Sequence, residues 1–266
     1  MNKLKFYNEY HLGDSGYHIH FCNKLCEYYD DVMITNYIRE DLVGISNEFI
    51  EPVYKDRIVN KPLGEKPDDA INSWINRNND YNIWISNIFT FDSFDIFYIE
   101  FYNRLFGECG YINPVNTVDK FLFDHTLITN PIKSITTKYD FIIINSIPMS
   151  GQWGYNESQF DTLISKLVDK GYSVITTKKS RTGVDCTLDM GYTLMDIGVV
   201  STNCKYVIGV HTAPWLYTLN KESINNIEFF ICLQNQGVGY SFSNVFSVRS
   251  SFDEVYNILE LKGINL

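Results

Sequence analysis

Residues 205–216, "KYVIGVHTAPWL", contain the change of pattern that decides the fold. A continuous apolar run ends at Val210, and His211 and Thr212 separate it from a helix expected to begin at Ala213. A strand that is apolar throughout and leads into a helix is typical of a parallel sheet covered on both faces. The turn is then either an ordinary helix start capped by Thr212 or a place where backbone amides meet the phosphates of a ligand.

The same alternation of strand and helix runs through the second half of the sequence. Strands are expected at residues 139–146, 172–179, 205–210 and 227–235, and helices at 156–171, 193–204, 212–221 and 251–263. Alternation of this kind predicts an α/β fold with a parallel sheet covered by helices. In such sheets, ligands bind beyond the carboxyl ends of the strands.

The first half of the sequence has a weaker pattern of the same kind. Strands are expected at residues 3–10, 31–38 and 81–86, and helices at 17–29, 68–78 and 93–110. Residues 124–139 carry no sustained periodicity. These features predict two Rossmann-like lobes, at 1–127 and 140–266, joined by a linker at 128–139, with a ligand cleft between the lobes.

Composition narrows the class of protein. The chain has 266 residues, 45% of them hydrophobic and 15% aromatic, which is enough to bury a core. Its net charge of −10, from 22 basic and 32 acidic residues, disfavours nucleic acid as a partner, because phosphate backbones need clustered Lys and Arg. No apolar run approaches the roughly 18 residues of a membrane span, and no signal peptide is recognisable, so we expect a soluble, cytoplasmic protein. The six cysteines form no CxxC pair, which predicts free buried thiols and no structural metal.

Two further turns follow strands of the second half. The first, "NSIPMSGQWG" at 145–154, contains Ser150 and Gly151 in a loop where backbone can approach a ligand closely. It matches neither a Walker loop nor GxGxxG. The second, "TTKKSR", places Lys178, Lys179 and Arg181 at a strand end, where they either neutralise phosphate charge or form a solvated basic loop.

The first half contains one carboxylate in a comparable place, Asp14 within "HLGDSG". Asp14 either caps the following helix or takes a proton from a hydroxyl nucleophile in a cleft. Gly13 would let an acceptor approach the backbone, and His11 lies in the same region. The nearby His18 and His20 lack metal-ligand spacing, so no metal site is expected here.

Three segments carry a resemblance to a known family: 11–25, 141–177 and 193–220. They resemble glycosyltransferases of the two-lobed GT-B fold, most closely the ADP-heptose:lipopolysaccharide heptosyltransferase-like group. The resemblance implies an inverting transfer of a sugar from a nucleotide-sugar donor to a glycan or other hydroxyl acceptor. It implies no cofactor beyond that co-substrate and no metal. It makes the first lobe the acceptor side and the second lobe the donor side.

The resemblance also assigns roles to individual residues. Asp14 is implied to be the general base, with His11 and Gly13 on the acceptor side. Thr212 and Ala213 are implied to present their amides to the diphosphate. The remaining donor-side residues that it implies are Ser150 and Gly151 facing the phosphates and the donor sugar, Lys178 near the nucleotide, and His211.

The sequence departs from the family pattern in ways that leave alternatives open. His211 replaces the usual aspartate, and Leu216 replaces the usual histidine of the following turn. These departures give no support to heptose as the donor sugar, and they favour a catalytically inactive nucleotide- or carbohydrate-binding module as the alternative. A third possibility is another Rossmann-like enzyme, such as an epimerase or a nucleotide hydrolase.

Overall fold

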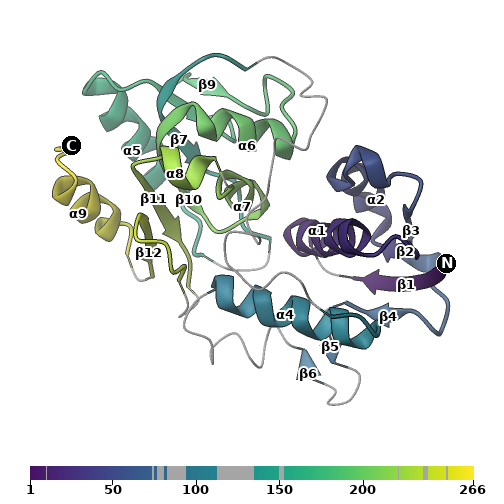
Figure 1. Cartoon of the computed structure of the whole chain (residues 1–266). Coiled ribbons are helices and arrows are strands. Elements are labelled where there is room, and N and C mark those ends of the chain that lie inside the picture. Colours follow the sequence, from purple (N-terminus) through teal and green to yellow (C-terminus); the bar gives the residue numbers. More distant parts are fainter. Residues whose placement is uncertain are drawn as a thin grey trace. The chain divides into compact units, whose positions relative to one another are not determined.

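A computed structural model describes most of the chain as two compact α/β units (Figure 1). The described residues are 1–9, 11–73, 75–76, 81–82, 94–112, 135–149, 153–220, 222–235, 239–249 and 251–266. Those up to residue 112 belong to the first unit and those from 135 onward to the second. Most of the expected linker at 128–139, and the boundary at residue 127, fall outside the described residues.

The first unit contains a four-stranded parallel sheet in the order β3-β2-β1-β4. Its strands are β1 (Asn2–Asn8), β2 (Val32–Ile38), β3 (Ile58–Pro62) and β4 (Ile71–Asn72). Two of the expected strands, at 3–10 and 31–38, are confirmed as β1 and β2. The prediction of a helix over 68–78 is wrong. In this segment β4 pairs with β1, and β5 (Ile75–Asn76) pairs antiparallel with β6 (Tyr81–Asn82). Hydrogen bonding to β1 outweighs the weak local helical pattern there.

The helices of this unit include α1 (Leu12–Tyr28), α2 (Val43–Ser46) and α4 (Phe94–Glu108), with short 3-10 turns between β2 and β4. Aromatic contacts join α1 to α4: the ring centroids of Phe21 and Phe106 lie 5.1 Å apart. The end of α1 is held by Arg57, whose guanidinium donates hydrogen bonds to the carbonyls of Cys26, Tyr29 and Val32. A cation at this end also complements the helix dipole.

The second unit contains a six-stranded sheet in the order β12-β11-β10-β7-β8-β9, and every neighbouring pair in it is parallel. The strands are β7 (Tyr139–Ile144), β8 (Val174–Thr176), β9 (Asp185–Cys186), β10 (Cys204–Val210), β11 (Phe229–Leu233) and β12 (Val245–Val248). The helices are α5 (Glu157–Asp169), α6 (Leu194–Thr202), α7 (Ala213–Thr218), α8 (Ser223–Asn226) and α9 (Asp253–Leu261). The expected strands and helices of this half are confirmed, whereas β9 and β12 were not expected.

Helices cover both faces of this sheet, as its predominantly apolar strands predict. One face packs Phe141 and Ile143 against Leu163 of α5 and Leu259 of α9. On the other face Trp215 of α7 packs against the ring of Phe230, with centroids 6.4 Å apart. The helix starts follow from local chemistry: Asn156 accepts a hydrogen bond from the amide of Ser158, and Thr193 forms a capping box with Asp196. None of the helices in the described part of the chain is long and apolar enough to cross a membrane.

The two central strands, β7 and β10, approach closely at Gly209, which pairs with Ile144. A Cβ atom built on Gly209 would lie 2.3 Å from the Cβ of Ile144 and 2.7 Å from its carbonyl oxygen. Only glycine fits this position without displacing backbone. The pairing of the two central strands therefore depends on Gly209.

We predict that Gly209→Ala destabilises the second unit by about 2 kcal/mol, because the added methyl group overpacks a rigid backbone contact. Gly154→Ala is the matched control, since a Cβ at Gly154 meets no atom within 4 Å. Chemical denaturation followed by circular dichroism measures both free energies of unfolding. Equal stability of the two variants would contradict the role given to Gly209.

Candidate functional site

The second sheet has a topological switch point between β7 and β10. From β7 the chain passes through α5 to β8 on one side, whereas from β10 it passes through α7 and α8 to β11 on the other. Connections that leave two neighbouring parallel strands in opposite directions open a crevice at their carboxyl ends, and ligands of α/β proteins bind there. Asn145 and His211 follow these two strand ends.

His211 is buried at the exit of β10, with 3% of its surface exposed. Its amide donates to the carbonyl of Leu233, and its Nε2 atom lies 3.1 Å from the hydroxyl of Tyr240. Its ring centroid lies 5.7 Å from that of Trp215. Burial lowers the pKa of the imidazole to about 4, so His211 is neutral at physiological pH. The exit of β10 therefore carries an uncharged ring.

Thr212 occupies the N-cap position of α7, as expected, but its side chain does not cap the helix. Its hydroxyl donates instead to the carbonyl of Val210 at 3.1 Å. The amides of Thr212, Ala213 and Trp215 donate no hydrogen bond to any of the described residues, and Pro214 has no amide hydrogen. Unpaired amide donors thus gather at the exit of β10.

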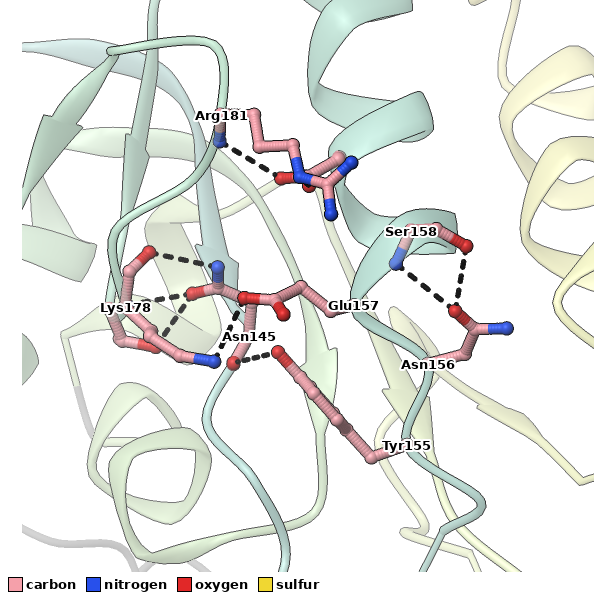
Figure 2. A network of polar contacts seen from close by, with 9 residues as sticks. Asn145, Tyr155, Asn156, Glu157, Ser158, Lys178 and Arg181 are labelled. Atoms are coloured by element: carbon pink, nitrogen blue, oxygen red, sulfur yellow. Dashed lines mark hydrogen bonds and ion pairs between the residues drawn. The ribbon is translucent and has the colours of Figure 1, made fainter.

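The exits of β7 and β8 are joined by the side chain of Asn145 (Figure 2). Its Nδ2 donates to the carbonyl of Lys178 at 2.9 Å, and its Oδ1 accepts from the amide of Lys178 at 2.8 Å. The hydroxyl of Tyr155 donates to the carbonyl of Asn145 at 3.1 Å. Asn145 is buried. Sequence reasoning missed it, although a polar residue directly after the apolar run 141–144 is a signal of such a role.

The side chain of Lys178 lies beside a carboxylate. Its Nζ atom is 2.9 Å from Oε1 of Glu157 and 5.6 Å from the ring centroid of Tyr155 (Figure 2). The hydrogen bond between Lys178 and Glu157 raises the pKa of Lys178 and lowers that of Glu157, so both side chains are charged at neutral pH.

Arg181 is paired in the same way, with its Nε atom 3.3 Å from Oδ2 of Asp161. Two of the three basic residues of this turn are therefore neutralised by acidic partners. Lys179 is exposed. The other predicted donor-side residues, Ser150 and Gly151, lie outside the described residues.

In the first unit, Asp14 lies in the first turn of α1, because this helix begins at Leu12 and not at residue 17. Its Oδ2 atom accepts a hydrogen bond from the amide of His11 at 3.0 Å, so the capping role is present. The side chain of His11 is half exposed, with Nδ1 3.8 Å from the same oxygen, and Gly13 lies in the same helical turn.

Asp14 is also electrostatically unusual. Its side chain is 21% exposed, and desolvation raises the pKa of its carboxyl from the ordinary 3.8 to about 6, against the opposing effect of backbone hydrogen bonds. It follows the carboxyl end of β1, whose neighbours are β2 on one side and β4 on the other. That position is the switch point of the first sheet.

The other histidines of α1 have neutral partners. His18 lies 2.9 Å from Oδ1 of Asn36 through Nε2, and His20 lies 2.5 Å from the hydroxyl of Tyr102 through Nδ1. Burial lowers the pKa of His18 to about 4. Among the described residues, no group of three or more His, Cys, Asp or Glu is arranged to hold a metal ion.

Two α/β units, each with a parallel sheet and a polar switch point, define a class of fold that comparison with known proteins identifies. No protein-family model and no curated protein sequence matches this chain. Among solved structures, the chain is similar to the E. coli heptosyltransferase WaaC with ADP-2-deoxy-2-fluoro heptose, with a TM-score of 0.60 and 11% identity over 98% of this chain and 100% of that one.

Two further solved structures are similar to this chain over most of its length. The glycosyl transferase family 9 protein from Veillonella parvula DSM 2008 gives a TM-score of 0.52 and 13% identity over 99% of this chain and 90% of that one. The E. coli ADP-heptose lps heptosyltransferase II gives a TM-score of 0.50 and 9% identity, over 95% of this chain and 91% of that one. The chain therefore has the GT-B fold of heptosyltransferases, which confirms the fold that the sequence resemblance implied.

We predict that the carboxyl group of Asp14 titrates near pH 6, because the folded protein disfavours its charged form. Carboxyl ¹³C NMR measures the midpoint, and the spectrum of Asp14→Asn assigns the resonance. A midpoint near the ordinary 3.8 would contradict the desolvation of this side chain.

Proposed function

We propose that this protein is a glycosyltransferase that moves a sugar from a nucleotide-sugar donor to a hydroxyl acceptor, with inversion and without a metal ion. The observation that carries the proposal is the group of unpaired amides at the switch point of the second sheet, in a chain with the fold of heptosyltransferases. E. coli WaaC, which has this fold, has been solved with ADP.

The donor is assigned to the second unit. The amides of Thr212 and Ala213 bind the diphosphate, and the loop containing Ser150 and Gly151 faces the phosphates and the transferred sugar. Oriented amide dipoles stabilise the charge that develops on the leaving diphosphate as its bond to the sugar breaks. Lys178 lies near the nucleotide in this assignment.

The acceptor is assigned to the first unit, where Asp14 is the general base. It removes the proton of the acceptor hydroxyl while that oxygen attacks the anomeric carbon, and the nucleoside diphosphate leaves from the opposite side. A pKa of about 6 suits this role, because the carboxylate is charged at neutral pH and still more basic than an exposed aspartate. His11 and Gly13 lie on the acceptor side.

A second candidate function is a nucleotide- or carbohydrate-binding module without catalysis. The observation that favours it is His211, a buried and neutral ring at the position where the resemblance expects a carboxylate. Such a module would bind nucleotide-sugars and release no product.

The proposed function predicts that Asp14→Asn lowers kcat at least a hundredfold, the usual size of a lost general base, and leaves the Kd of the nucleotide within threefold. A panel of nucleotide-sugars with sugar and glycan acceptors, read by release of nucleoside diphosphate, measures transfer. Isothermal titration measures binding.

Asp56→Asn is the matched control, because Asp56 is an exposed carboxylate of the same unit. Full turnover by Asp14→Asn would remove Asp14 from the role of base. Nucleotide-sugar binding by the wild type with no turnover on any acceptor of the panel would favour the binding module.

A further inference from the structure

The turns at the carboxyl edge of the first sheet contain more acidic than basic side chains. They are residues 9–14 after β1, 39–42 after β2 and 61–70 around the end of β3. Together they hold seven Asp or Glu and three Lys or Arg. In the sheet order β3-β2-β1-β4, the ends of β2 and β3 lie about 5 and 10 Å from that of β1. The charges of all three turns therefore act on ligands that approach Asp14.

Three ion pairs neutralise part of this charge. In each, the charged atoms are 3.5 Å apart or less, and the pairs are Arg39 with Asp41, Lys61 with Glu65, and Lys5 of β1 with Asp69. The ammonium of Lys66 has no carboxylate partner among the described residues and lies 4.6 Å from the ring centroid of Tyr7. Lys66 therefore offsets the remaining acidic charge alone.

Four carboxylates of these turns have no Lys or Arg partner within the described residues. Three of them, Glu9, Glu40 and Asp68, are exposed. The fourth is Asp14, beside His11, whose ring is charged only when it is protonated. Against the single ammonium of Lys66, the four carboxylates leave an excess of three negative charges.

This excess decides which acceptors can approach the edge. Exposed charges interact over the Debye length, which is about 10 Å at 0.1 M salt and so covers all three turns. A carboxylate or phosphate on the acceptor would meet charge of its own sign, and like charges placed opposite each other exclude wrong partners. A neutral glycan meets no such repulsion.

We propose that the acceptor of this protein is a glycan without acidic groups near its accepting hydroxyl, and that the unpaired carboxylates at the carboxyl edge of the first sheet exclude acidic glycans. Glu9, Glu40 and Asp68 then determine specificity through their charge and not through contact. This inference rests on the proposed function, since it takes this edge to be the acceptor side. It names the class of acceptor that the proposed function leaves open.

The test compares two acceptors of equal shape, a methyl uronoside and its uronamide, which differ by one negative charge. Gluco, galacto and manno forms are offered to the full chain with a panel of nucleotide-sugars, and release of nucleoside diphosphate is measured. At low ionic strength, kcat/KM is expected to be about tenfold higher for the uronamide, the effect of three unit charges at about 8 Å in water. In about 0.5 M salt, where the Debye length is shorter, this ratio is expected to fall below about twofold.

Two triple variants assign the effect to particular residues. The edge variant combines Glu9→Gln, Glu40→Gln and Asp68→Asn. It removes the excess charge, so the ratio is expected to fall below about twofold through a higher kcat/KM for the uronoside. The matched control variant combines Glu228→Gln, Glu260→Gln and Asp169→Asn, which are exposed carboxylates of the second unit. It changes the net charge of the chain equally and leaves the ratio at about tenfold.

Three results would overturn the inference while the proposed function stands. They are transfer to the uronoside at least as fast as to the uronamide, a ratio that salt does not change, and an unchanged ratio in the edge variant. In the last two cases direct contacts select the acceptor, and the charge of the edge does not. If the wild type transfers sugar to neither acceptor from any nucleotide-sugar of the panel, the proposed function fails and the inference fails with it.

Discussion

The close approach of β10 to β7 at Gly209 is the contact on which the second unit depends. A side chain there would collide with Ile144, so the absence of a Cβ atom lets the two central strands pair. Their pairing makes neighbours of two strands whose connections leave in opposite directions. The switch point, and with it the polar turns that follow both strands, results from this arrangement.

The two units share a construction, and their switch points carry different polar groups. In the first unit, β1 lies between β2, which the chain reaches directly through α1, and β4. In the second unit, β7 lies between β8, which the chain reaches directly through α5, and β10. The turn after β1 leads into a helix whose first turn holds the partly desolvated carboxylate of Asp14, whereas the turn after β10 holds unpaired amides and the neutral ring of His211. In the proposed function, the carboxylate is the base and the amides bind the diphosphate.

Most of the second unit could be predicted from the sequence, because its strands are predominantly apolar and the side chains of Asn156 and Thr193 cap the starts of α5 and α6. The two-residue strand β4 could not, since its stability comes from pairing with β1 and not from its own residues. The candidate site was predictable only in part. Asp14 and Thr212 stand out locally, whereas the bond between Asn145 and Lys178 joins residues far apart in the chain.

The most direct test is a titration of the isotope-labelled protein with a nucleoside diphosphate, followed by amide resonances in two-dimensional NMR. Binding at the switch point shifts the amide signals of Thr212 and Ala213 at the carboxyl edge of the second sheet. The signals of Asp140 and Lys205, near the amino ends of the same strands, remain in place. Shifts confined to the amino edge or to the first unit would contradict a nucleotide site at the switch point.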